Sequence, residues 1–186
     1  MNQVYLFLAQ GFETIEALTV VDILRRADVP IKTVSITEYN QVESTHKIKV
    51  EADAVFTECD FVDATMLVLP GGMPGTANLE AHEGLCNLIE EAVKKDIKVA
   101  AICAAPSILG KKGLLSGRDA TVYPGFETYL KDANVLDREV VVDGNFITGR
   151  GMGTTIDFAL TILEELGYKE TAQKVGRAIQ FTQYYK

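Results

Sequence analysis

The chain has 186 residues, a length that favours a single domain with a substantial hydrophobic core. Its net charge is −8, which argues against nucleic acids and anionic membranes as main partners. The first residues lack the pattern of a secretory leader, and no apolar run approaches the roughly 20 residues of a membrane span. We therefore expect a cytoplasmic protein.

Short apolar runs alternate with helical patterns along the chain. The apolar runs predict buried strands at 4–8, 31–36, 65–69 and 98–102. Further strands are expected at 119–123, 138–142 and 145–148, and polar–apolar alternation predicts an antiparallel excursion at a sheet edge over 40–58. Helices are expected at 14–27, 82–95, 154–166 and 169–180, with another directly after residue 103. This order predicts an α/β fold with a doubly wound, mostly parallel sheet and helices on both faces, forming one domain over 1–186.

The three cysteines are Cys59, Cys86 and Cys103. Their odd number and the absence of a C-x-x-C spacing argue against a disulfide framework and against a metal site. Cys86 falls on the apolar stripe of a predicted helix, and Cys59 lies between Glu58 and Asp60, whose negative charges disfavour a thiolate. We therefore expect neither of these two to be the reactive group.

Cys103 lies where a predicted strand meets a predicted helix, with alanines on both sides. Small neighbours are what a tight strand-to-helix turn requires, and such a turn exposes its central side chain. It would also place the sulfur at a helix N-terminus, where the helix dipole favours thiolate, and aim the Ala104 amide at an oxyanion. The alternative, a buried cysteine that packs like alanine, stays open on this pattern alone.

Glu16 follows the first predicted strand, in the first turn of a helix that Thr14 could cap. The helix terminus would lower the pKa of this carboxyl, whereas burial in a cleft would raise it. If burial dominates, a protonated Glu16 could donate a hydrogen bond to a thiolate. Otherwise Glu16 is an ordinary first-turn acid that stabilises the helix dipole.

Two glycine-rich segments also follow strands, at 70–75 and 148–154. The first would let backbone amides approach a ligand closely, or is simply a tight loop. The second faintly resembles a dinucleotide fingerprint, but no strand–helix unit with a ribose-binding acid follows it, so we expect no nucleotide cofactor. Thr154 as a helix cap is a sufficient account of that segment, and His82 is expected to be a solvated residue at a helix start.

Four motifs together are similar to the ThiJ/PfpI superfamily, over essentially all of the chain. These are Gly-Phe-Glu-Thr-Ile-Glu at 11–16, Val-Leu-Pro-Gly-Gly at 68–72, Ala-Ala-Ile-Cys-Ala-Ala-Pro at 100–106 and Gly-Arg-Gly-Met-Gly-Thr at 149–154. Their order and spacing most resemble the deglycase and YajL-like branch. The resemblance implies a flavodoxin-like fold of the class I glutamine amidotransferase type, a homodimer and no cofactor.

The resemblance also assigns roles within the site. It implies that Cys103 is the nucleophile, that Glu16 is its protonated hydrogen-bond partner, and that the amides of Gly72 and Ala104 form the oxyanion site. Further pocket candidates are Gly71, Tyr123, Arg26 and His46. The last two stand where the deglycase branch has arginines near its pocket.

Two departures from the family pattern affect the expected function. The protease-like branch has His directly after its cysteine, where this chain has Ala104, so a peptidase is disfavoured. The deglycase branch has His where this chain has Tyr123, and a phenol with an ordinary pKa of about 10 is a poor general base near neutral pH. Proton transfer would then depend on Glu16 or water.

Two functions are consistent with these residues. The first is a cofactor-independent glyoxalase or protein deglycase, in which the Cys103 thiolate attacks reactive dicarbonyls such as methylglyoxal, or their adducts. The alternative is a redox sensor or stress chaperone in which Cys103 oxidises to a sulfinate. Tyr123 favours the second function or slow turnover in the first.

Overall fold

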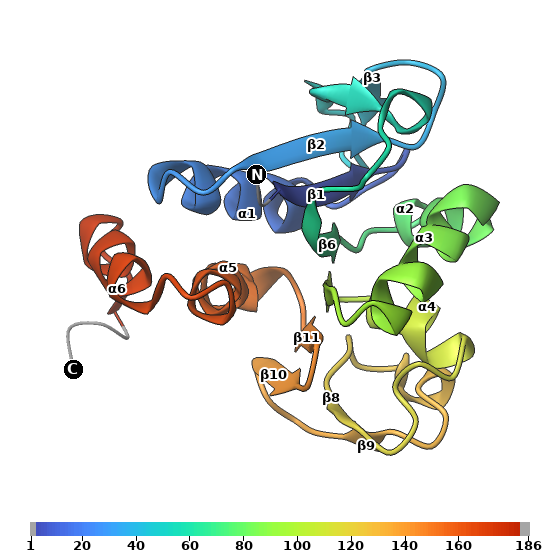
Figure 1. Cartoon of the computed structure of the whole chain (residues 1–186). Helices are drawn as coiled ribbons and strands as arrows, with labels where there is room; N and C mark the ends of the chain where they lie inside the picture. Colours follow the sequence, from blue (N-terminus) through green and yellow to red (C-terminus); the bar gives the residue numbers. More distant parts are fainter. Residues whose placement is uncertain (1–2, 183–186) are drawn as a thin grey trace.

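The apolar runs of the sequence form the centre of a seven-stranded sheet. The computed structural model describes residues 3–182, and the strand order is β10-β11-β7-β6-β1-β2-β5 (Figure 1). Every neighbouring pair is parallel except β10 and β11. The strands are β1 (Gln3–Leu8), β2 (Ile31–Ser35), β5 (Ala54–Val55), β6 (Ala64–Leu69), β7 (Lys98–Ile102), β10 (Val140–Asp143) and β11 (Phe146–Gly149).

Helices cover both faces of this sheet, because side chains of one strand alternate between them. Leu6 and Leu8 face one core, whereas Tyr5 and Phe7 face the other. The first core is closed by α1 (Thr14–Arg26), α5 (Thr155–Glu165) and α6 (Lys169–Ala178). The second is closed by α2 (Gly75–Ala81), α3 (Glu83–Lys94) and α4 (Pro106–Lys111), on the opposite side in Figure 1. The predicted doubly wound α/β fold is thus confirmed.

The connecting segments differ from the sequence prediction in two places. The excursion at 40–58 forms a separate two-stranded sheet of β3 (Gln41–Glu43) and β4 (Lys49–Glu51) before the chain returns to the main sheet as β5. The strand expected at 119–123 is shorter and covers only β8 (Asp119–Ala120). It pairs with β9 (Asn134–Val135) in a separate two-stranded sheet, outside the main sheet. The main sheet instead ends at the β10–β11 hairpin, and the residues after Ala120 turn toward β7.

Helix starts also differ from the predicted ones. Helix α2 was not predicted, because it is short and begins at Gly75, directly after Pro74. Glu13 rather than Thr14 caps α1, and its carboxylate accepts a hydrogen bond from the Glu16 amide. His82 is not simply solvated: it caps α3 by accepting from the Leu85 amide, and it packs against Phe56.

Thr154 is the residue before α5, but its hydroxyl forms no capping hydrogen bond to that helix. It instead donates to the Gly151 carbonyl oxygen, 2.9 Å away, within the short 3₁₀ turn Met152–Thr154. The hydroxyl therefore closes the glycine-rich turn in front of the helix, which corrects the capping role expected from the sequence.

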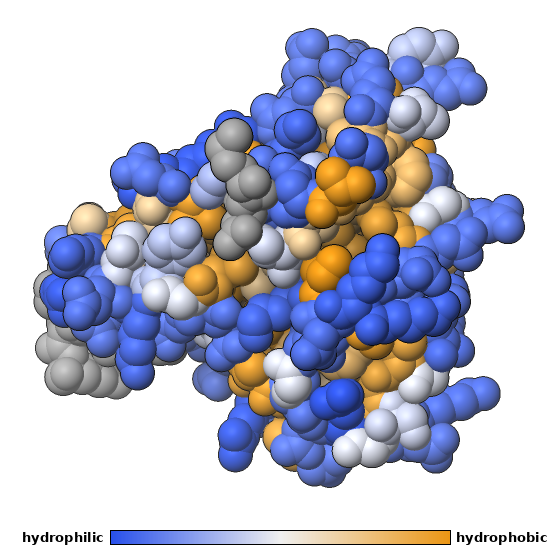
Figure 2. Space-filling view, viewed as in Figure 1, coloured by the Kyte–Doolittle hydropathy of each residue, from blue (hydrophilic) through white to orange (hydrophobic). Residues whose placement is uncertain are grey.

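The molecular surface agrees with the acidic, polar composition. Figure 2 shows hydrophilic residues over most of one face, with hydrophobic residues gathered between them near the middle of the view. Within residues 3–182, every helix is too short or too polar to traverse a lipid bilayer.

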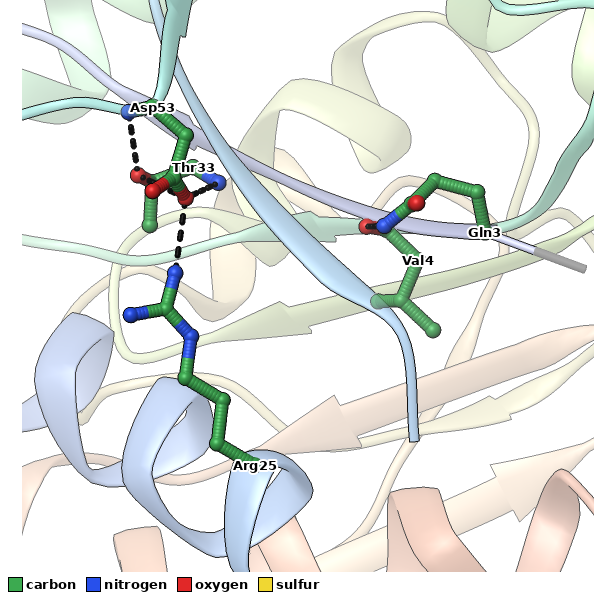
Figure 3. A network of polar contacts seen from close by, with 5 residues as sticks. All are labelled: Gln3, Val4, Arg25, Thr33 and Asp53. Atoms are coloured by element: carbon green, nitrogen blue, oxygen red, sulfur yellow. Dashed lines mark hydrogen bonds and ion pairs between the residues drawn. The ribbon is translucent and has the colours of Figure 1, made fainter. Parts of the chain in front are cut away.

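Asp53 ties the edge strand β5 to its neighbours (Figure 3). Its carboxylate accepts from the backbone amide and the hydroxyl of Thr33, each at 2.8 Å, and from the Arg25 guanidinium at 2.8 Å. Burial alone would raise the pKa of Asp53, but the hydrogen bonds from Thr33 and Arg25 outweigh it and lower that pKa. Ionised Asp53 therefore stabilises this edge of the sheet.

We expect Asp53→Ala to lower the free energy of unfolding by about 2 kcal/mol, because it leaves the amide of the buried Thr33 without its acceptor. The loss should be present at neutral pH and shrink below about pH 3.8, where the ordinary carboxyl is protonated in the unfolded chain. Urea denaturation at several pH values measures it. Arg25→Ala is the matched control and should cost less than 1 kcal/mol, since that ion pair is solvent-exposed. Equal losses in both variants would contradict this account.

Candidate active site

Three strands that are followed by candidate site residues end at the same edge of the sheet. Strands β1, β6 and β7 are adjacent and parallel, so the segments that follow them lie side by side. Glu16 comes after β1, Gly71 and Gly72 come after β6, and Cys103 comes after β7. The topology thus brings together residues that are as many as 87 positions apart in the sequence.

Cys103 occupies a sharp turn between β7 and α4. Its φ is +64°, in the left-handed region that non-glycine residues rarely adopt. Two backbone hydrogen bonds hold it there: the Cys103 amide donates to Gly149 O at 2.9 Å, and Cys103 O accepts from the Tyr123 amide at 2.9 Å. Conformations of this kind persist only where the surroundings enforce them, and they concentrate at functional sites.

The thiol of Cys103 lies next to backbone amides. Those of Ala104 and Gly72 lower the pKa of the thiol. Helix α4 begins at Pro106, three residues after Cys103, so Cys103 stands just before a helix N-terminus, although this helix is only six residues long. The two amides add local positive charge.

Glu16 is buried next to this thiol. It is 1% exposed, and its Oε2 accepts a hydrogen bond from the Gly71 amide at 2.8 Å. Burial raises the pKa of Glu16 to about 7, against the lowering effect of its hydrogen bonds with Cys103 and Gly71. Of the two effects weighed from the sequence, burial is therefore the stronger.

The thiol and the carboxyl titrate as a pair. Burial, and then the charge of an ionised Glu16, raise the pKa of the Cys103 thiol to about 12, whereas the Ala104 and Gly72 amides lower it. The pair therefore carries two protons below about pH 7 and one proton above it, shared between sulfur and carboxyl. One form of the one-proton state is a thiolate that receives a hydrogen bond from protonated Glu16.

This burial predicts a pH-dependent stability. Because the pKa of Glu16 is higher in the folded protein than its ordinary 4.5, the folded state holds this proton more tightly, and stability falls as pH rises from 4.5 to about 7. Glu16→Gln removes this ionisation. Compared with the variant, the wild type should lose about 3 kcal/mol of unfolding free energy over that interval. Denaturant titrations at pH 4.5 and pH 8 test this, and parallel pH profiles would contradict it.

Gly71 leaves no room for a side chain between the two reactive groups. A Cβ at this position would lie 2.7 Å from Cys103 Cβ and 2.7 Å from Glu16 Oε2. Contacts this close force the neighbours apart. The glycine-rich loop after β6 is thus required at this position for the approach of thiol and carboxyl, and is not only a turn.

We expect Gly71→Ala to lower kcat/KM for the reaction proposed below by about 100-fold, because displacements near 1 Å have effects of this size. Steady-state kinetics measure the loss, and circular dichroism checks that the variant is folded. A folded Gly71→Ala variant with wild-type kinetics would show that the close packing is unnecessary.

The other pocket candidates lie in different surroundings. Tyr123 is next to the site: its amide binds the Cys103 carbonyl, and its half-exposed ring lies over Gly151. Arg26 is not near it, since it lies ten residues after Glu16 on α1, about 15 Å along the helix, and pairs with Asp22. His46 lies in the exposed turn between β3 and β4, beside Thr45, whose hydroxyl donates to the Met73 carbonyl oxygen.

Two supporting contacts were not anticipated from the sequence. Gly149 O anchors the Cys103 amide, and the Glu13 carboxylate accepts a hydrogen bond from the amide of Glu16. An acidic residue three positions before Glu16 was the available signal for the second contact. The first contact requires the register between β7 and β11, which the sequence does not reveal.

Residues 2–165 match the model of the DJ-1/PfpI family. The chain belongs to this family. Protein dj-1beta of Drosophila melanogaster is 34% identical over 174 residues, covering 92% of this chain and 93% of that protein. Protein DJ-1 homologs A and B of Arabidopsis thaliana are 36% and 32% identical, and the chain spans 44% and 40% of their lengths.

A solved structure and a named enzyme extend the comparison. The structure of a DJ-1 superfamily protein from Salmonella typhimurium matches with a TM-score of 0.92 and 33% identity, over 97% of this chain and 99% of that one. The glutathione-independent glyoxalase DJ-1 of Schizosaccharomyces pombe is 27% identical over 96% of this chain and 98% of that protein. The family and fold expected from the motifs are therefore confirmed.

Proposed function

We propose that the protein is a cofactor-independent glyoxalase that converts methylglyoxal to lactate, with related deglycase activity on methylglyoxal adducts. The observation that carries this proposal is the buried Glu16 carboxyl, with a pKa raised to about 7, packed on Gly71 beside the thiol of Cys103, which stands on a left-handed turn. A family relative named as a glutathione-independent glyoxalase supports it.

The first step is attack of the Cys103 thiolate on the aldehyde carbon. A carbon–sulfur bond forms, and the carbonyl electron pair moves to oxygen. In this proposal the amides of Gly72 and Ala104, which lower the pKa of the thiol in the free protein, stabilise this oxyanion. Protonated Glu16 then donates its proton to the oxygen, giving a neutral hemithioacetal and a carboxylate.

The second stage moves a proton between the two carbons. The Glu16 carboxylate removes the proton from the former aldehyde carbon, leaving an enediolate. Protonated Glu16 then returns the proton to the former ketone carbon, while the hydroxyl proton on the first carbon moves to the neighbouring oxygen, giving a lactyl thioester and the Glu16 carboxylate. The aldehyde carbon is oxidised and the ketone carbon reduced within one molecule, so no external electron acceptor is required. Water then cleaves the resulting thioester, releasing lactate and the Cys103 thiol.

The test is stoichiometric conversion of methylglyoxal to lactate by purified protein, without glutathione and with a metal chelator present. Equal amounts of methylglyoxal lost and lactate formed are expected. Loss of methylglyoxal without lactate would reduce the reaction to simple trapping by thiols and amines, and would overturn the proposal.

One feature favours a second function, peroxide sensing through Cys103. Tyr123, whose amide binds the Cys103 carbonyl, has a half-exposed ring, and a phenol is a poor proton shuttle near neutral pH. Two peroxide molecules would convert the thiolate to a sulfinate and two waters, and the Gly72 and Ala104 amides would bind the sulfinate oxygens. Selective oxidation of Cys103 by peroxide in protein that forms no lactate would favour this function.

We further propose that the chain forms a homodimer, as the family resemblance implies. In support, α1 and α5 expose Ile15 and Ile156 at the rim of a largely apolar cavity of about 430 Å³. Analytical ultracentrifugation measures the assembly, and a monomer at micromolar concentration would contradict it.

A further inference from the structure

A second cavity adjoins the Cys103 turn. It has a volume of about 340 Å³, and its walls come from Tyr123 and from the segment that follows β11, including Arg150, Gly151 and Met152. Backbone hydrogen bonds connect both walls to Cys103: the Tyr123 amide binds the Cys103 carbonyl, and the Cys103 amide binds the oxygen of Gly149, the residue before Arg150. The cavity therefore lies beside the turn that carries the sulfur.

The cavity presents apolar surface. Tyr123 is 49% exposed and Met152 50% exposed, although both are large hydrophobic side chains. The Tyr123 ring is held by an edge-to-face contact with Phe126, at 6.4 Å between centroids, and by Gly151, where a Cβ would lie 3.3 Å from the ring. A fixed aromatic face next to a flexible thioether is suited to a flat or branched apolar group.

The charges around the cavity disfavour an anionic group. Among the described residues that line it, Arg150 is the single charged side chain, and its guanidinium forms an ion pair with Asp137. A neighbouring cavity of about 300 Å³ shares Pro124 and Arg150 and is lined by the carboxylates of Glu127 and Asp137. A carboxylate or phosphate tail would meet an arginine already paired with Asp137 and one further negative charge, that of Glu127, whereas a neutral tail would not be repelled.

We propose that this cavity is a subsite for the neutral apolar tail of an α-oxoaldehyde, so that the enzyme prefers aryl or branched-alkyl glyoxals to methylglyoxal. This inference rests on the proposed glyoxalase function and names its substrate class. Its size is sufficient, since an apolar cavity of about 150 Å³ already holds benzene. A pocket that accepts several additional carbons changes specificity by roughly tenfold to 100-fold.

The test compares kcat/KM for phenylglyoxal and methylglyoxal, from initial rates. We expect the wild type to prefer phenylglyoxal about tenfold or more. Tyr123→Ala and Met152→Ala should reduce that ratio about tenfold, mainly through KM for phenylglyoxal, while Tyr123→Phe keeps the aromatic face and the preference. Val62→Ala, which truncates a side chain that is 84% exposed and outside the cavity lining, should leave both rates unchanged.

A second measurement does not require turnover. Acetophenone should slow alkylation of Cys103 by iodoacetamide more than acetone does, and Tyr123→Ala should abolish that difference. Methylglyoxal turnover without a phenylglyoxal preference, or with a preference that both truncations leave intact, would overturn the subsite but not the glyoxalase. If neither aldehyde is turned over, the proposed glyoxalase function fails. In that case, equal protection of Cys103 from alkylation by acetophenone and acetone would overturn the subsite as well.

Discussion

Cys103→Ser is expected to reduce lactate formation from methylglyoxal to the uncatalysed rate. The serine hydroxyl retains the shape of the turn, but its proton is held far more tightly than that of a thiol, so the neighbouring Glu16 cannot generate an oxyanion nucleophile near neutral pH. The left-handed turn with its bonds to Gly149 and Tyr123 remains available to the variant. The loss should therefore appear in kcat, with folding unaffected.

Cys59→Ser is the matched control for this substitution. Cys59 is also half-buried and free, but its sulfur donates to the Val55 carbonyl oxygen at 3.7 Å, away from the strand ends that form the site. Burial raises the pKa of its thiol. We expect Cys59→Ser to form lactate at the wild-type rate. Equal activity in Cys103→Ser, or equal losses in both variants, would show that Cys103 is not the nucleophile.

Glu16→Gln is expected to lower kcat by about 10²- to 10⁴-fold, the usual contribution of a positioned general acid–base. Glutamine can still accept the Gly71 amide hydrogen bond and donate to the sulfur, so the site keeps its shape. It cannot move a proton between the two substrate carbons. Steady-state kinetics measure the loss, and an activity within threefold of wild type would exclude Glu16 as the proton carrier.

The same variant separates the two titrations of the pair. In the wild type, the rate of Cys103 alkylation by iodoacetamide should rise with pH and level off near pH 7, when the first of the two shared protons is lost. In Glu16→Gln only the thiol titrates, and burial raises its pKa. The alkylation rate should then continue to increase well above pH 7. Identical pH profiles would contradict the shared-proton account.

The central sheet could be predicted from the sequence because its strands are buried on both faces. The segments at 65–69 and 98–102 read as apolar runs, which match β6 and β7 closely. The strand predicted at 119–123 was wrong over most of its length, because burial alone does not distinguish a strand from a packed loop. Buried residues there, such as Thr121 and Val122, pack as a loop, and the Thr121 amide donates to the Thr148 hydroxyl without joining the ladder of the main sheet.

The candidate site was only partly accessible from the sequence. Small residues around Cys103 indicated a tight turn, and the family motifs pointed to Glu16. The burial of Glu16 depends on Gly71, 55 residues away, and no local pattern encodes that contact. Arg26 shows the opposite error. The family resemblance suggested it as a pocket residue, but it lies several turns from Glu16 along the regular helix α1.

The most direct test of the account is the bond between Cys103 and the substrate. Methylglyoxal labelled with ¹³C at the aldehyde carbon would be added to Glu16→Gln and followed by NMR. This variant retains the thiol but should stall before the carbon-to-carbon proton transfer. We expect a protein-bound resonance of an sp³ carbon attached to oxygen and sulfur, absent when Cys103 is also replaced by Ser. The same resonance in the double variant, or none in Glu16→Gln, would contradict covalent catalysis by Cys103.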